Sequence, residues 1–138
     1  ATSTLVHELV HMVTRVQGNQ EHWIAEGTAE YYSLELMRRV GLISQSRFDR
    51  ALDWMRNHGK DVRTLRDVRS HGPKTARAVQ LFHELDREIG EASDGERNLD
   101  DLMRRLIEVR VPGLDDLREA AEVVIGRPST TLASPLLD

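Results

Sequence analysis

The sequence predicts an all-α fold, and three observations lead to that prediction. Apolar residues recur at steps of three and four positions through most of the chain, which places them on one face of a helix. Glycine, asparagine, proline and serine stand where these periodic segments begin or end, as they do at helix termini. No segment of useful length alternates apolar and polar residues as a half-buried strand does, and no internal repeat appears.

About six helices are predicted, and each is bounded by residues that favour helix ends. Ser44 or Ser46 can cap the third helix, Asn98 can cap the fifth, and Pro73 suits the first turn of the fourth. The second helix carries an acidic residue in its first turn and arginines in its last turn, which matches the helix dipole. Counted with their caps, the predicted segments are residues 3–17, 21–40, 44–58, 73–89, 98–107 and 114–125.

Three stretches lie outside these helices. Residues 60–72 are rich in arginine and carry Val62, Leu65 and Val68 at three-residue spacing, which predicts one or two helical turns. Residues 91–96 form a polar loop, and the last ten residues are expected to be extended or frayed. We therefore expect one helical domain, residues 1–126, followed by a C-terminal tail, residues 127–138.

The composition excludes several classes of partner. The net charge is −4, and the basic residues are interspersed with acidic ones, so nucleic acid is not an expected partner. No apolar run approaches the roughly 18 residues that cross a bilayer, and the first residues lack a signal-peptide pattern, which favours the cytoplasm over a membrane. The chain has no cysteine, so histidine and carboxylate side chains must hold any transition metal.

The motif His7-Glu8-x-x-His11 lies in the first predicted helix. Residues four apart on a helix differ by about 40° in azimuth and about 6 Å along the axis, so both imidazoles can reach one metal ion. Glu8 then points near the metal but not along the line of the two histidines, which suits a base that acts on metal-bound water. Apolar residues flank the motif, so the histidines stand on a helix with a large buried face.

Two carboxylates follow on the second predicted helix. Glu26 belongs to the pattern Trp23-x-x-Glu26-Gly27, and Gly27 would permit the first two helices to approach closely enough for Glu26 to meet the histidines. Glu30 is four residues further on and shares the face of Glu26. Fourteen residues separate His11 from Glu26 and eighteen separate it from Glu30, so spacing and helix geometry leave the third ligand open.

The segment HELVH followed by WIAEGTAEYY resembles the gluzincin zinc peptidases, especially the M1 aminopeptidases and the M61 glycyl aminopeptidases. The resemblance is strong over residues 7–43 and loose to about residue 125, where KTARAVQLFHELDREIG and NLDDLMRRLIEV resemble later helices of the group. It implies the helical C-terminal half of a thermolysin-like catalytic domain. It also implies a peptide or protein substrate and, because the chain starts so close to the motif, a missing N-terminal part.

Carried over by position, the resemblance makes His7, His11 and Glu26 the ligands of one zinc ion per chain. Glu8 becomes the general base and proton shuttle. The spacing of the M1 pattern fits Glu30, but the preceding tryptophan and following glycine favour Glu26. We expect Glu26 to be the third ligand. A loop between two helices can lose residues without moving the helices, whereas the Trp-x-x-Glu-Gly packing has to accompany the ligand that it positions.

One departure concerns the tyrosine that steadies the tetrahedral intermediate in these families. Gly72 stands where that tyrosine would fall, in the stretch HGPKT, and His71 is the nearest residue able to donate a hydrogen bond to an oxyanion. His71 is thus a candidate catalytic residue, with a plain loop histidine as the alternative. The exopeptidase motif of the families lies upstream of the zinc helix and is not in this chain.

The main prediction is a gluzincin-type zinc peptidase, weakly active or inactive without its missing part. The alternative is a non-catalytic zinc-binding or scaffold domain, which the missing tyrosine favours, and a chance motif in a helical interaction domain is a further reading. His22 and His58 are expected to be exposed and His83 to be a core or edge residue. The aromatic residues are expected to pack, namely Trp23, Tyr31, Tyr32 and Trp54.

Overall fold

The computed structural model describes residues 21–66, 72–109 and 112–138. Over these ranges the chain is all-helical and contains no strand, which confirms the predicted fold class. The predicted helix at residues 3–17 lies outside the described residues. The described elements are α2 (His22–Arg39), α3 (Gln45–His58), α4 (Gly72–Ala92), α5 (Leu99–Leu106), α6 (Leu114–Ile125) and two short 3-10 helices, η1 (Thr131–Ala133) and η2 (Pro135–Leu137).

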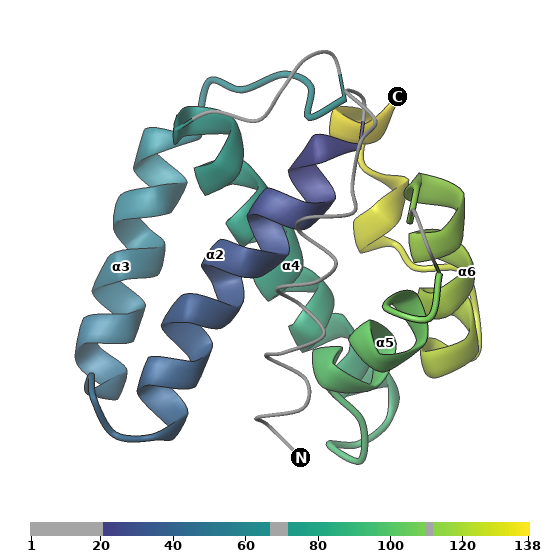
Figure 1. Ribbon diagram of the computed structural model, residues 1–138, viewed down its shortest axis with the longest axis horizontal. Helices are drawn as coiled ribbons and strands as arrows, with labels where there is room; N and C mark the ends of the chain where they lie inside the picture. The colour runs from purple at the N-terminus through teal and green to yellow at the C-terminus, as the bar shows by residue number, and fades with distance from the viewer. Residues whose placement is uncertain (1–20, 67–71, 110–111) are drawn as a thin grey trace.

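Helix α4 lies at the centre of the arrangement. It packs against α2 and α3 on one side and against α5, α6 and η1 on the other, with α3 and α6 at opposite sides of the view (Figure 1). Fully buried side chains from its whole length face these neighbours, among them Val79, Phe82, Leu85 and Ile89. The core therefore forms around α4, and the position of any other helix is set largely by its contact with α4.

Two helix starts are capped by residues that the sequence predicts. Ser44 accepts a hydrogen bond from the Arg47 backbone N–H at 3.1 Å and begins α3. Asn98 accepts one from the Asp100 N–H at 2.9 Å, and its own N–H donates to Asp101 at 3.0 Å. These two hydrogen bonds form the capping box at the start of α5. These local interactions explain why the predicted and observed starts of α3 and α5 agree. The predicted bounds of α2 and α6 also agree closely with the observed ones.

One local prediction is wrong. Gly90 was expected to end the fourth helix, but α4 continues through it to Ala92, because burial of Leu85 and Ile89 outweighs the cost of about 1 kcal/mol for a helical glycine. The stretch predicted to hold one or two helical turns lies partly outside the described residues; up to Arg66 it forms one turn, with the Val62 N–H donating to the Gly59 carbonyl at 3.1 Å, and does not continue as a helix. Instead the Leu65 backbone N–H donates to the Leu136 carbonyl at 3.0 Å, which ties this stretch to the C-terminal residues.

The C-terminal tail is packed, whereas the sequence suggested an extended or frayed end. Leu132 and Leu137 are each 1% exposed and Leu136 is 9% exposed, so the tail adds to the same hydrophobic core as the helices. Of its two 3-10 helices, η1 follows Pro128 and η2 begins with Pro135. The prediction failed because burial of the tail depends on partners far away in the sequence, such as Glu88, which lies 41 residues before Ser129.

Glu88 on α4 anchors the tail. Its carboxylate accepts hydrogen bonds from Ser129 Oγ at 2.6 Å, from the Thr130 N–H at 2.9 Å and from Arg127 Nη1 at 2.8 Å. Burial alone would raise the pKa of Glu88, but these hydrogen bonds, with one from Thr131, outweigh it and lower the pKa to about 2. Since the folded-state pKa is depressed, the anchor stabilises the fold when the carboxylate is ionised.

We predict that this anchor makes stability depend on acid pH. Its contribution is fully present above the unfolded pKa of about 4.5 and is lost as the pH falls towards 2. Between about pH 6 and about pH 3 the free energy of unfolding should fall by about 2 kcal/mol on account of Glu88. Urea unfolding checks this: Glu88→Gln should lose most of that dependence, while Glu84→Gln, at an exposed position of α4, should keep it. Equal pH dependence in both variants would contradict the role of Glu88.

No helix within residues 21–66, 72–109 and 112–138 combines the length and the apolar character that crossing a bilayer requires.

Candidate metal site

The pattern Trp23-x-x-Glu26-Gly27 occupies the first two turns of α2, where Trp23 is completely buried. Its ring stacks on Phe82 of α4, with 5.8 Å between ring centroids. Its indole N–H donates to Glu21 Oε2 at 3.2 Å, and Arg66 Nη2 donates to the other oxygen of Glu21 at 2.6 Å. The tryptophan is thus held by both packing and hydrogen bonding, and it fixes the rotation of α2 about its axis.

Gly27 marks the closest approach between α2 and α4. A Cβ atom at this position would lie 2.7 Å from Ala78 Cβ and 3.0 Å from Phe82 Cε2. The sequence predicted a close approach at Gly27, but towards the histidine helix; the described contact is with α4. Because neighbouring residues on a helix point about 100° apart, the face of Glu26 is turned well away from the α4 contact.

We predict that Gly27→Ala destabilises the fold by up to about 2 kcal/mol. Alanine gains about 1 kcal/mol of helix propensity over glycine, but the new methyl group overlaps Ala78, and relieving such overpacking costs about 1–3 kcal/mol or more. Chemical unfolding measures the change. The matched control is Gly90→Ala on α4, where nothing lies within 4 Å of the added Cβ, so the free energy of unfolding should rise by about 0.5–1 kcal/mol. A Gly27→Ala protein as stable as Gly90→Ala would contradict the close contact.

Glu26 is the one proposed zinc ligand that falls within the described residues. Its side chain is 41% exposed, and Oε1 lies 3.6 Å from Nε2 of His22, one helical turn earlier. Glu30, the alternative ligand, is exposed one turn later. The other candidate residues, His7, Glu8, His11 and His71, lie outside the described residues. A glutamate carboxylate is a ligand type that zinc accepts, so the chemistry of Glu26 is compatible with the predicted role.

Within the described ranges no three histidine, aspartate or glutamate side chains gather as a metal site would require. A zinc site at Glu26 would therefore need further ligands from outside the described ranges. Among the described residues Glu26 forms no ion pair with lysine or arginine, whereas Glu21, Glu35 and Glu88 each pair with arginine. Its carboxylate is thus available to a cation in a way that the other three are not.

Three predictions about single side chains can be compared with the structure. His22 was expected to be exposed, but its side chain is 21% exposed and lies against Glu26. Trp54 was expected to pack into the core, but it is 61% exposed and stacks on His58, with 4.7 Å between ring centroids. His58 is exposed as predicted. Both errors arose because helix periodicity alone does not tell which face a neighbouring helix covers.

His83 is a partly buried edge residue, as predicted. Its ring lies 6.2 Å, between centroids, from both Tyr31 and Phe48, and burial lowers its pKa. Among the described residues its Nδ1 has no hydrogen-bond partner. These contacts give His83 a packing role at the meeting point of α2, α3 and α4.

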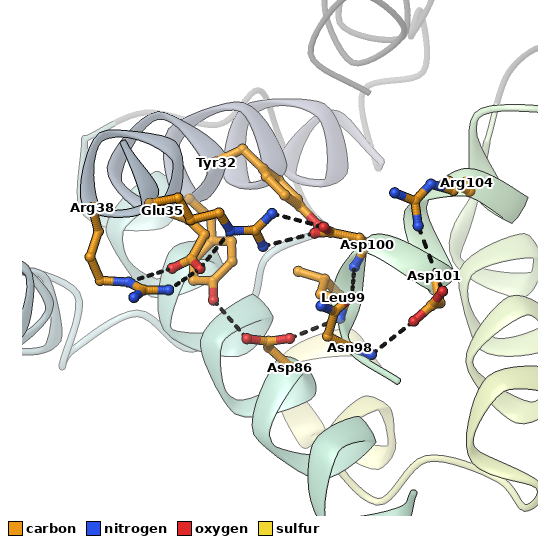
Figure 2. A network of polar contacts seen from close by, with 11 residues as sticks. Tyr32, Glu35, Arg38, Asp86, Asn98, Leu99, Asp100, Asp101 and Arg104 are labelled. Atoms are coloured by element: carbon orange, nitrogen blue, oxygen red, sulfur yellow. Dashed lines mark hydrogen bonds and ion pairs between the residues drawn. The ribbon is translucent and has the colours of Figure 1, made fainter. Parts of the chain in front are cut away.

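A buried ion-pair network holds the other end of α2. Asp100 of α5 accepts two hydrogen bonds from Arg39, at 2.8 and 3.0 Å, and one from the Tyr32 hydroxyl at 2.7 Å (Figure 2). Glu35, which is 5% exposed, accepts from Arg39 at 3.0 Å and from Arg38. Burial raises the pKa of Tyr32, and the nearby Asp100 raises it further. Burial also acts to raise the pKa of Asp100, but the hydrogen bonds from Arg39 and Tyr32 outweigh it, so the pKa of Asp100 is lowered.

Asp86 joins α4 to the same network. It accepts from the Tyr31 hydroxyl at 3.1 Å and from the Leu99 backbone N–H at 2.8 Å, so it links α2, α4 and the start of α5 (Figure 2). No local sequence pattern predicts these pairs, because their partners are far apart along the chain. Each carboxylate is matched by donors, which indicates a structural network that orients α2 and carries no reactive group of its own.

Comparison with known proteins identifies no relative: no protein family, no curated protein and no solved structure matches this chain.

Proposed function

We propose that the chain carries the zinc-binding part of a gluzincin-type metallopeptidase, with His7, His11 and Glu26 as ligands and Glu8 as general base. The observation that supports this most is the state of Glu26: a half-exposed carboxylate without an arginine or lysine pair among the described residues, on a helix locked by Trp23 and Gly27. The residues around it belong to the Trp-x-x-Glu-Gly pattern of residues 23–27.

The chemistry follows from the roles of these residues. Zinc, when bound, supplies a Lewis acid that polarises the scissile carbonyl and makes water a stronger nucleophile near neutral pH. Glu8 takes the proton of the attacking water and passes it to the leaving amine. Trp23 and Gly27 contribute by fixing α2 against α4, so that Glu26 is presented in one orientation before the metal arrives.

A second candidate function is a non-catalytic zinc-binding or scaffold domain. It is favoured by Gly72, the first residue of α4, which has no side chain to donate to an oxyanion at the position where the related families have tyrosine. His71, just before it, is the proposed substitute donor in the peptidase. The two functions share the metal site and differ in turnover.

Removal of metal tests the peptidase function. The protein that contains this chain should lose peptide hydrolysis when it is treated with a chelator, because both the bound ion and the activated water are lost. Activity should return when one equivalent of zinc is added. Retained zinc without any hydrolysis across a broad peptide library would favour the scaffold function, and hydrolysis that survives complete removal of metal would contradict both.

A further inference from the structure

Two large apolar side chains are exposed on the described helices: Trp54 on α3 is 61% exposed and Val123 on α6 is 53% exposed. The Trp54 ring stacks on His58, so it needs little further ordering when it binds a partner. Figure 1 shows α3 and α6 at opposite sides of the molecule. One copy of the chain therefore cannot bring Trp54 and Val123 together, whereas two copies can.

The exposed surface of α3 has two sides that differ in charge. On one side Asp53 pairs with Arg56 at 3.0 Å, and Asp49 accepts a hydrogen bond from Gln45 at 2.9 Å. The other side carries no carboxylate, and its exposed residues, three and four positions apart, are Arg47, Arg50, Trp54 and His58. Within the described ranges no ion pair neutralises its two arginines. This side, the α3 surface, is therefore an exposed indole flanked by unpaired positive charge.

A surface of opposite charge lies between α6 and the residues where α5 ends. It is a hollow of about 130 Å³, smaller than the roughly 300–1,000 Å³ of typical small-molecule sites, so it suits a single side chain. Its lining includes three apolar residues and three carboxylates, namely Val109, Ala120, Val123, Glu108, Asp116 and Glu119. Arg105 also lines it and offsets one negative charge, and Asp116 accepts from the Gly113 N–H at 2.9 Å. The hollow thus combines an apolar lining with a net negative charge.

We propose that a second copy of the chain docks on this hollow through its α3 surface, with Trp54 seated in the hollow of its neighbour. Charge complementarity supports this partner, because Arg47 and Arg50 then approach Glu108 and Glu119. Tryptophan and arginine are also the residues that most often dominate protein interfaces. Nucleic acid is a poorer partner for the α3 surface, since the chain carries a net charge of −4. The inference is independent of the proposed zinc site.

The two surfaces differ, so the contact is heterologous, and a third copy can add to the second in the same way. Sedimentation velocity of the whole chain over a range of concentrations tests this. The wild type should associate progressively, and added salt should weaken the association by screening the charges. Trp54→Ala and Glu119→Arg, both at exposed positions, should each weaken it by at least about tenfold. Arg56→Ala, on the other side of α3, is the matched control and should associate like the wild type.

A mixture of the two weakened variants tests the pairing of the surfaces. Trp54→Ala keeps an intact hollow, and Glu119→Arg keeps an intact α3 surface. Each variant alone should stay monomeric, but an equimolar mixture should form a dimer that grows no further, because the remaining surfaces are disabled.

Three results would overturn the proposal. A wild-type chain that stays monomeric up to about 1 mM would leave the α3 surface to an acidic partner of another kind. Self-association of Glu119→Arg alone, as strong as that of the wild type, would mean that the α3 surface meets a site other than the hollow. An associating wild type whose two variants form no dimer when mixed would mean that these surfaces do not pair.

Discussion

Replacing Glu26 with alanine should weaken zinc binding by at least about a hundredfold, whereas Glu30→Ala should weaken it by about tenfold or less. Spacing from His11 does not decide between the two, since Glu30 has the separation found in the related aminopeptidases. We propose Glu26 because of its surroundings: Trp23 and Gly27 pack its turn of α2 against α4, and His22 lies beside it. Glu30 is exposed.

Zinc dissociation constants of the two variants decide the assignment. Glu84→Ala serves as a control, because it removes an exposed glutamate from α4 and should leave the affinity unchanged. If Glu30→Ala abolishes zinc binding and Glu26→Ala barely weakens it, the third ligand is Glu30, and the assignment from the Trp23 and Gly27 pattern is wrong.

The Glu8→Gln variant should keep its zinc but hydrolyse peptides at least about a hundredfold more slowly. Glutamine has nearly the shape of glutamate and cannot accept the proton of the attacking water, so the chemical step suffers while the ligands remain. Turnover and metal content should be measured on the same preparation of the complete protein. Loss of zinc in proportion to activity would show that Glu8 is a ligand and that its assignment as base is wrong.

Local interactions made much of the fold predictable. Ser44 and Asn98 cap their helices with their own side chains, and Gly126 ends α6 with a positive φ of 89°. Such signals lie within a few residues of the helix end that they determine, so the sequence alone locates them. Helix α4 was misjudged at Gly90 because its continuation depends on burial against other helices.

Long-range contacts explain what could not be predicted. The tail is held in place because Glu88, some forty residues earlier, accepts hydrogen bonds from it. No periodic pattern in the sequence predicts such a distant partner. At the candidate site, the sequence predicted that Trp23 would be buried and that Gly27 would allow a close approach. It could not show that α4 makes that approach, through Ala78, or that His22 would turn towards Glu26.

The central claim is that this chain binds a single zinc ion through its two motif histidines and Glu26. Elemental analysis of the purified protein, after incubation with zinc and dialysis, tests that claim most directly. We expect about one zinc per chain, because three protein ligands hold the ion and leave one position open, as in catalytic sites. A protein that retains no zinc and takes up none when it is offered would contradict the account.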